Sequence, residues 1–369
     1  MSNEIIQQKK IMFLITGSDI GGAEIVVKNL IFNLDQNRFS PIFVSIRPLG
    51  KIGKEVSKIS RTFSLGASKK FNPLLLWRLW SLLRKERPAI LHCHLFHANF
   101  LGRIIGTMAR IPFIISTVHS DNFGSKLRYF LLRITDRLND MTVAVSEKIK
   151  NDLIKNKITN ENKVKVIYNG IIEYRNNVPT EEVDSIKEKL NLANSNPIIL
   201  SVGRLDIVKG HIYLVRAVKL LKEKYKNLKL ILIGDGPERR FLEKEVWNLN
   251  LTDDVLFLGE ITDLDVYYQL ANIFVLPSIN EGFGLAALEA MSNRLLVVAS
   301  QVGGIPEIIQ DKISGFMFQS CNPEELSIKI DQALSVSTEE KEKIINNAYN
   351  NFKENFSLDK MLDNYYKLY

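Results

Sequence analysis

Two cations stand close together in a segment whose position suits the binding of a polyanion. Arg204 and Lys209 lie five residues apart in SVGRLDIVKGH, just after the apolar run 197–203. A guanidinium can hold two oxygens at once and an ammonium is a compact charge, so the two together could clamp a diphosphate. The alternative is a pair of solvated surface cations. We expect the clamp, because both residues follow a strand.

Two carboxylates, Glu281 and Glu289, stand in the segment PSINEGFGLAALEAMSN at 277–293. A Gly-Phe-Gly turn at 282–284 separates them, and a helix is expected to follow it. The N–H groups at a helix start suit a phosphate, and carboxylates accept hydrogen bonds from the vicinal hydroxyls of sugars. Two independent surface glutamates are the alternative.

Two glycines, Gly21 and Gly22, follow the first apolar run, 11–16, where a helix is expected to begin. Without side chains they let backbone N–H groups approach an anion, and the helix dipole adds attraction. The spacing is neither GxGxxG nor GxxxxGK[ST], so an ordinary tight turn remains an equal alternative.

The elements that must position these residues alternate between short apolar runs and helical patterns. Uninterrupted apolar strands separated by helices indicate parallel sheets that are covered on both faces, and hence two doubly wound, Rossmann-like α/β domains. Strands are expected over 11–16, 41–46, 89–94, 113–117, 141–145 and 165–169 in the first half, and over 197–203, 228–234, 255–259, 273–278 and 295–300 in the second.

The length of 369 residues and the hydrophobic fraction of 46% also suit two domains. A turn-rich stretch, NLANSNP, predicts domains over 1–194 and 195–350. Helices are expected to begin at Ser146 and at Pro323, and a C-terminal helix over 351–369 is expected to cross back to the first domain. Ligands bind at the carboxyl ends of parallel strands, so two such domains predict a site in the cleft where they face each other.

An ordered set of motifs along nearly the whole chain now supports a family resemblance. The chain resembles the retaining GT-B glycosyltransferases of family four, which include bacterial lipopolysaccharide and capsule enzymes. It departs from the family pattern at 291–295, where the usual Gly and Pro are missing. The matching motifs are GGAE at 21–24, HCHLFHAN at 92–99, a strand ending in His119, VIYNG at 166–170, VGRLDIVKG at 202–210, GDGP at 234–237, PSINEGFG…E at 277–289 and GGIPE at 303–307.

The resemblance implies a role for each matching residue. Arg204 and Lys209 would bind the donor diphosphate, Glu281 would contact the donor sugar near its reacting face, and Glu289 would hold the ribose. From the first half, Gly22 would approach the distal phosphate and His119 would lie near the anomeric centre. Backbone N–H groups around Phe283, Gly284 and Leu285 would hold sugar and phosphate, and the loop at Gly234 would help to seat the base.

The predicted activity is transfer of a hexosyl group from a nucleotide diphosphate sugar, expected to be a UDP-sugar, with retention of anomeric configuration. The acceptor is expected to be a hydroxyl of a glycan or of a polyprenyl-diphosphate-linked glycan in bacterial surface polysaccharide synthesis. The resemblance implies no cofactor or metal, since the two cations replace a divalent ion. The alternatives are a nucleotide-sugar epimerase or hydrolase, and a non-catalytic glycan- or nucleotide-binding module.

The histidines need a separate interpretation. His92, His94 and His97 surround Cys93, but only His92 and His94 share a face of the expected strand, and no second pair of ligands follows at zinc spacing. We expect them to line the floor of the acceptor cleft or to pack at the sheet edge. In a retaining transfer the leaving phosphate can take the acceptor proton, so His119 is expected to donate a hydrogen bond rather than to act as a base; a packed structural histidine is the alternative.

The formal net charge of +8 arises from the first half of the chain, since the second half is mildly acidic. No nucleic-acid-binding signature accompanies the charge, so nucleic acid is not an expected partner. Two segments, 71–88 and 126–138, mix Leu, Trp or Phe with basic residues and could lie on an anionic membrane surface; packing on a sheet is the alternative. With two distant cysteines, the expected location is cytoplasmic, and peripheral at the inner face of the membrane.

Overall fold

The computed structural model describes residues 8–67, 74–120, 123–173 and 178–369. Within these ranges the chain forms two compact units. The first contains residues up to Gly170 together with Leu358–Tyr369, and the second contains Ile171–Ser357. Each unit is built around one parallel sheet, of seven and six strands respectively, so the expected pair of doubly wound α/β domains is confirmed.

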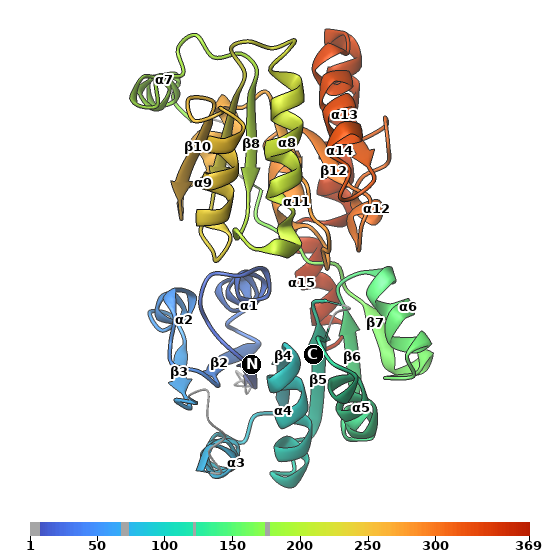
Figure 1. Ribbon diagram of the computed structural model, residues 1–369. Helices are drawn as coiled ribbons and strands as arrows, with labels where there is room; N and C mark the ends of the chain where they lie inside the picture. The colour runs from blue at the N-terminus through green and yellow to red at the C-terminus, as the bar shows by residue number, and fades with distance from the viewer. Residues whose placement is uncertain (1–7, 68–73, 121–122, 174–177) are drawn as a thin grey trace, which may run out of the picture. The chain divides into compact units, whose positions relative to one another are not determined.

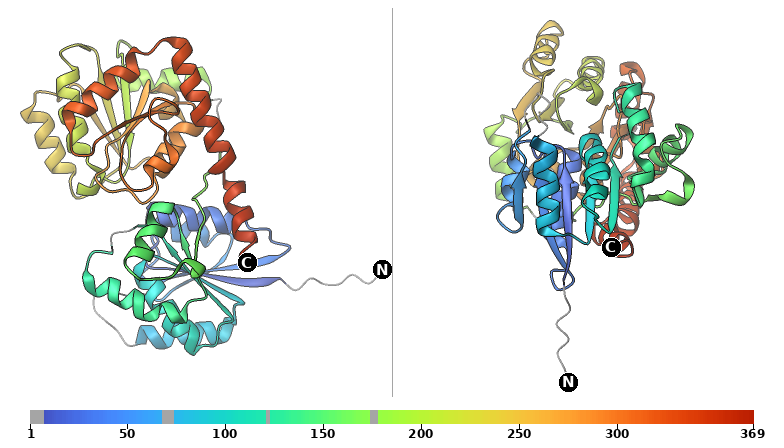
Figure 2. Two further views of the ribbon diagram at one scale, coloured as in Figure 1. Left: turned by 90° about the vertical axis from the view of Figure 1, so that its right-hand side faces the viewer. Right: turned by 90° about the horizontal axis from the view of Figure 1, so that it is seen from below.

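The first sheet has the strand order β3-β2-β1-β4-β5-β6-β7, and every neighbouring pair is parallel. Figure 2 shows helices on both of its faces. The strands are β1 (Lys9–Ile15), β2 (Phe39–Ser45), β3 (Arg61–Ser64), β4 (Ile90–His94), β5 (Phe113–Val118), β6 (Met141–Ala144) and β7 (Val164–Val166). The helices are α1 (Gly22–Asn33), α2 (Lys51–Val56), α3 (Leu74–Glu86), α4 (Phe96–Met108), α5 (Lys126–Thr135), α6 (Glu147–Lys155) and α15 (Leu358–Tyr366), with short 3-10 turns η1 (Asp136–Leu138) and η2 (Glu161–Lys163).

The second sheet has the order β10-β9-β8-β11-β12-β13, again parallel throughout. Its strands are β8 (Ile198–Val202), β9 (Lys229–Ile233), β10 (Val255–Gly259), β11 (Ile273–Leu276), β12 (Leu296–Ser300) and β13 (Phe316–Phe318). Its helices are α7 (Thr180–Lys189), α8 (His211–Leu221), α9 (Arg239–Asn248), α10 (Asp265–Leu270), α11 (Leu285–Ser292), α12 (Ile305–Ile308), α13 (Pro323–Ser335) and α14 (Thr338–Asn355), with the 3-10 turn η3 (Ile207–Lys209) (Figure 1).

The central strands consist mostly of buried apolar residues because both faces of each sheet are covered. In β1 the residues Ile11–Ile15 are completely buried, and β12 is buried along its whole length. The expected helix starts are confirmed by their caps. Ser146 accepts a hydrogen bond from the backbone N–H of Ile149, and α13 begins at Pro323 after Asn322, which accepts from Glu325.

The domain boundaries differ from those expected. The chain passes to the second unit at Ile171 rather than at 195, because α7 packs against α10 and so belongs to the second unit. At the other end, α14 remains in the second unit, where it packs against α11, and the return to the first unit begins at Leu358 rather than at 351. The predicted C-terminal helix is therefore α15 alone.

None of the helices in the described ranges combines the length and the apolar composition needed to cross a bilayer. Two edge strands, β3 and β13, were not predicted. The first has a half-exposed pattern and the second spans three residues, so neither produces an apolar run of the kind that marks a buried strand.

Candidate active site

The candidate site of the second unit lies where the strand order of its sheet reverses. From β8 the chain proceeds to β9 on one side, whereas β11 flanks β8 on the other side. Loops that leave the carboxyl ends of two such strands diverge and create the place where open α/β sheets bind ligands. Arg204 and Lys209 follow β8, and Glu281 follows β11, so the topology brings these three predicted residues to one end of one sheet.

Backbone contacts hold the two loops together. The N–H groups of Ile279 and Asn280 lie 2.8 and 3.2 Å from the carbonyl oxygen of Val208, which accepts from both. Gly210 has φ +65°, and a Cβ atom there would lie 2.1 Å from the carbonyl oxygen of Pro277. Only glycine tolerates both the backbone conformation and the close approach. The turn that carries Lys209 is therefore fixed against the loop that carries Glu281.

Lys209 and Glu281 form an ion pair in this arrangement. The Lys209 Nζ lies 2.6 Å from Glu281 Oε2, and Ser278 Oγ donates to the same oxygen at 3.2 Å. Both side chains are largely buried, with 26% and 14% of their area exposed. An ammonium has three N–H donors, so Lys209 can contact a phosphate while it holds the carboxylate.

Arg204 stands apart from that pair. Its side chain is 68% exposed, and its Nε lies 3.7 Å from Asp206 Oδ2, beyond good hydrogen-bonding distance. Its loop is anchored to the loop after β9, where a Cβ at Gly234 would lie 2.0 Å from the Gly203 carbonyl oxygen. Gly234 thus has a packing reason to be glycine, and the guanidinium is left in solvent with N–H donors available to an anion.

The turn after Glu281 is shaped by a second glycine loop. Gly303 has φ +56°, and a Cβ there would lie 1.6 Å from the carbonyl oxygen of Glu281. The N–H of Gly304 lies 3.3 Å from that oxygen. These contacts hold the backbone of Glu281, so the glycines of the motif GGIPE support a predicted site residue.

The start of α11 has the backbone that the sequence predicts. Gly284 adopts φ +110° and is the N-cap, Leu285 is the first helical residue, and Phe283 is buried against Phe356 with ring centroids 5.6 Å apart. The first N–H groups of a helix have no helical acceptor and can bind an anion. Phe283 therefore anchors the turn through its ring.

Glu289 is the fifth residue of α11 and is 8% exposed. Tyr268, on α10, donates a hydrogen bond of 2.9 Å to its Oε2. Sequence reasoning did not find Tyr268, because a tyrosine in the helical pattern 265–270 carries no local sign of a buried partner. The phenol fixes the orientation of a carboxylate whose predicted task is to hold a diol.

The first unit has a reversal of its own, between β1 and β4. Gly21 is the N-cap of α1 and Gly22 is its first residue, so the two glycines lie at a helix start as expected. His94 ends β4, and His119 follows β5 directly. His94 Nδ1 and His119 Nε2 are 3.0 Å apart, and burial lowers the pKa of His119 to about 4, which makes its ring neutral near pH 7.

His92 and His94 are completely buried in a central strand of the sheet, and the expectation that they pack at its edge is wrong. The expectation fails because β4 pairs with both β1 and β5. His92 Nδ1 lies 2.7 Å from the hydroxyl of Tyr369, and its Nε2 lies 2.7 Å from Thr117 Oγ1. No group of three or more metal-ligating side chains occurs among the described residues.

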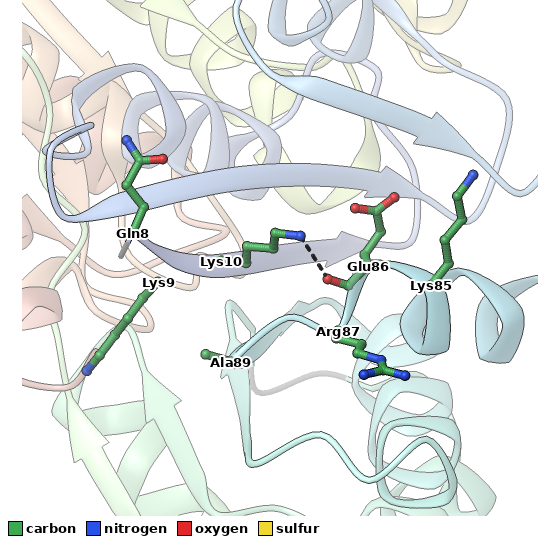
Figure 3. A pocket seen from close by; sticks show the side chains of 7 residues that line it. All are labelled: Gln8, Lys9, Lys10, Lys85, Glu86, Arg87 and Ala89. Carbon is green, nitrogen blue, oxygen red and sulfur yellow. Dashed lines mark hydrogen bonds between the residues drawn. The ribbon is translucent and has the colours of Figure 1, made fainter. Parts of the chain in front are cut away.

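A basic pocket of about 440 Å³ lies at the opposite, amino-terminal end of β1 and β4 (Figure 3). The Lys10 ammonium donates to the Glu86 carbonyl oxygen at 3.2 Å, and Lys9 donates to the carbonyl oxygen of Tyr369 at 3.1 Å. This end is remote from the carboxyl ends of the strands, so the pocket is no part of the predicted donor site. It is lined by Gln8, Lys9, Lys10, Lys85, Glu86, Arg87 and Ala89.

Comparisons with known proteins agree with this architecture. Residues 20–173 match the family described as Glycosyltransferase Family 4, and residues 182–351 match Glycosyl transferases group 1. An uncharacterized glycosyltransferase of Methanocaldococcus jannaschii is 33% identical over 291 residues, which cover 75% of this chain and 74% of the relative. The Escherichia coli UDP-Gal:alpha-D-GlcNAc-diphosphoundecaprenol alpha-1,3-galactosyltransferase is 30% identical over 65% of each chain.

Among solved structures, Anabaena HepE in complex with UDP and glucose superposes with a TM-score of 0.86 and 20% sequence identity, covering 98% of this chain and 99% of HepE. A glycosyltransferase from Rickettsia africae superposes with a TM-score of 0.85 at 23% identity over 98% of both chains. At these identities the likeness concerns the fold.

Proposed function

Because the chain belongs to the family 4, or group 1, glycosyltransferases, we propose that it transfers a hexosyl group from a UDP-sugar to a hydroxyl with retention of anomeric configuration. The observation that carries the proposal is that the ion pair of Lys209 and Glu281 and the exposed Arg204 all stand in the loops at the carboxyl ends of β8 and β11. A UDP-sugar is supported by HepE, whose structures contain UDP, glucose and UDP-glucose, and by the UDP-Gal named for the Escherichia coli relative.

The proposed chemistry exchanges one bond at the anomeric carbon for another. The bond from the anomeric carbon to the diphosphate oxygen breaks, and a bond to the acceptor oxygen forms on the same face of the sugar. The acceptor proton passes to the leaving diphosphate. Arg204 and Lys209 stabilise the charge that develops on that diphosphate, and a donor that is removed from such a position costs on the order of 10²–10³ in rate.

The remaining residues orient the donor in this proposal. Glu281 accepts hydrogen bonds from sugar hydroxyls, Glu289 holds the ribose diol, and the N–H groups around Phe283–Leu285 bind sugar and phosphate. Gly22 leaves room for the distal phosphate, and His119 donates a hydrogen bond to the sugar. No metal or other cofactor is needed, because two side-chain cations supply the charge; activity should therefore survive EDTA unchanged.

The proposed acceptor is a glycan on a polyprenyl diphosphate, which is supported by the diphosphoundecaprenol acceptor named for the Escherichia coli relative. The direct test incubates the protein with a panel of UDP-sugars, with and without such an acceptor, and follows UDP release and the anomeric proton signals of the product. Release that requires acceptor, with the donor configuration kept, supports the proposal. Release without acceptor would favour the hydrolase or epimerase, and tight binding without turnover would favour a binding module.

Peripheral attachment to the inner face of an anionic membrane is the remaining part of the proposal. The segment 71–88 lies within the described residues from Leu74 onward. Trp77 and Trp80 of α3 are 60% and 38% exposed, and Arg84 continues the same helical face. Trp and Leu at the depth of lipid head groups, flanked by Arg and Lys, are typical of an interfacial helix.

The helix α5 repeats this pattern. Leu127, Phe130 and Ile134, spaced for one helical face, are 64%, 55% and 45% exposed. The helix α4 packs against both α3 and α5 (Figure 1). The two helices that carry the apolar stripes therefore share one neighbour. Exposed basic residues accompany both stripes: Arg78, Arg84, Lys85 and Arg87 near α3, and Lys126, Arg133 and Arg137 near α5.

Vesicle flotation tests the attachment. Binding should require anionic lipid, fall as salt rises, and weaken in Phe130→Ser and Trp77→Ser. Trp247→Ser is a matched control, because Trp247 is an exposed tryptophan, 70% accessible, in the second unit. Binding that ignores lipid charge and salt, or that falls equally in Trp247→Ser, would argue against this surface.

A further inference from the structure

The contact between His94 and His119 contains information about where its proton lies. The two nitrogens that meet are His94 Nδ1 and His119 Nε2, at 3.0 Å. Burial lowers the pKa of His119 to about 4 and that of His94 well below its ordinary value, so both rings are neutral near pH 7. A neutral imidazole has one N–H donor and one acceptor nitrogen, so two arrangements of the shared proton are possible.

The far nitrogen of His94 distinguishes the two arrangements. His94 Nε2 is buried and has no hydrogen-bond partner among the described residues. If His94 accepted at Nδ1, its proton would sit on Nε2 as a buried N–H without an acceptor, which proteins rarely tolerate. If His94 donates from Nδ1, Nε2 is a buried, unprotonated nitrogen that lacks only a donor. The second arrangement is the less costly one.

The surroundings prevent His94 from turning to find another partner. Its ring lies 4.1 Å, centroid to centroid, from the ring of His92 and 6.2 Å from that of Phe13. His92 is itself held at both nitrogens, by Tyr369 and Thr117, each at 2.7 Å. Tyr369 thus helps to hold His92 in place, and His92 packs against His94.

We propose that His94 is a positioning residue that holds His119 in the Nδ1–H tautomer. His119 Nε2 accepts from His94, so Nδ1–H is the one polar group that His119 can offer to a ligand. In that state His119 donates a hydrogen bond and has no nitrogen left to take a proton. The inference rests on the proposed function for the identity of the ligand, whereas the tautomer is a property of the free protein.

The tautomer is measurable directly in the intact, ligand-free protein. The sequence has five histidines, so ¹⁵N-histidine labelling gives a simple long-range ¹H–¹⁵N spectrum, in which His119→Asn assigns the signals of His119. We expect a protonated Nδ1 and an unprotonated Nε2 for His119, the opposite of the usual preference of free histidine. A protonated Nε2 on His119 would overturn the proposal, whatever the activity of the protein.

Two substitutions at His94 separate positioning from packing. In His94→Asn the side-chain amide N–H stands close to the position of the imidazole Nδ1 and can still donate to His119, whereas His94→Leu fills the space without a donor. We expect His94→Leu to lower kcat by roughly tenfold to a hundredfold, the lower part of the range for a lost donor, with a smaller change in donor KM. His94→Asn should retain most of kcat and the Nδ1–H signal of His119.

These outcomes are distinguishable from a failure of the proposed function. If the protein turns over no UDP-sugar, the spectrum of wild type and of His94→Asn still decides the tautomer. If His94→Leu fails to fold, the same two spectra carry the test. Equal losses of kcat in His94→Asn and His94→Leu, with the His119 signals unchanged in both, would show that His94 only packs.

Discussion

The two sheets reverse their strand order at equivalent places, yet the predicted site residues there differ in chemistry. The reversal in the second unit, between β8 and β11, exposes Arg204 and pairs Lys209 with Glu281. The reversal in the first unit, between β1 and β4, has two glycines at a helix start and neutral, buried histidines behind them. One topology thus carries an ion pair of lysine and glutamate in one unit and a pair of neutral imidazoles in the other.

In the proposed reaction, the same backbone plan serves two different tasks. Charged groups that would bind a diphosphate must remain hydrated or paired, and in the second unit the loops that carry such groups are held together by glycines. Neutral imidazoles can be buried and kept in one orientation, which suits a directional hydrogen bond. The residues at the loops, and not the topology, decide which role each reversal takes.

The largest expected effect follows the removal of charge from the second reversal. Lys209→Ala should lower kcat/KM on the order of 10²–10³ and weaken UDP binding, because it removes a cation from the diphosphate and leaves Glu281 without its partner. Affinity for uridine, which has no phosphate, should barely change. Calorimetry with UDP and uridine checks this, with Lys224→Ala, a surface cation paired to Asp331, as the control. Equal losses for both ligands would contradict the clamp.

Acid should lower the stability of the first unit more than that of the second. In the first unit, burial lowers the pKa of His92 to about 3 and that of His119 to about 4, and it also lowers the pKa of His94. The second unit has one buried histidine of this kind, His211, whose pKa burial lowers to about 3. In the unfolded chain these groups take up protons near pH 6.5. Their contribution to stability is therefore complete above that pH and declines as pH falls toward 3–4, by roughly 1.4 kcal/mol per pH unit for each histidine.

With two more buried histidines, the first unit should lose roughly 3 kcal/mol more than the second over one pH unit in this window. Hydrogen exchange followed by mass spectrometry at pH 7, 6 and 5, corrected for intrinsic rates, should show the first unit opening first. Earlier opening of the second unit would mean that its carboxylate pairs, not the histidines, control acid stability.

The sequence predicted the residues at the reversal of the second unit better than those at the reversal of the first, for a physical reason. Arg204, Lys209 and Glu281 stand in short segments beside strands, so local patterns indicate both their chemistry and their place. The partners of His92 come from distant segments: Tyr369 lies at the end of the chain and Thr117 on another strand. Such contacts depend on how β4 pairs with β5 and on where the C-terminal segment packs, which no local pattern encodes. Tyr268 was missed for the same reason.

A smaller loss of activity should follow when a methyl group is added at Gly303, next to the backbone of Glu281. Gly303→Ala puts a Cβ where the carbonyl oxygen of Glu281 lies, so the loop must shift, and activity should fall roughly tenfold with about 1–3 kcal/mol of lost stability. Gly66→Ala in the first unit is the control. Gly66 has a similar φ of +67° but only Arg78 Nη1 nearby, at 3.8 Å, so it should lose stability and keep activity. Equal activity in both variants would separate Glu281 from catalysis.

The smallest expected effect concerns the orientation of Glu289. Tyr268→Phe removes the phenol that donates to its Oε2 at 2.9 Å and leaves a buried carboxylate with one contact fewer. Because the lost bond has a charged acceptor, stability should fall by about 1.5–3 kcal/mol at most, and donor KM should rise several-fold while kcat changes little. Tyr267→Phe, on the same helix, is the matched control. Measuring the rate as a function of donor concentration in both variants tests this. If Tyr268→Phe lowers the melting temperature and leaves donor KM unchanged, Glu289 only stabilises the packing of α10 and α11. The ribose would then bind to another residue.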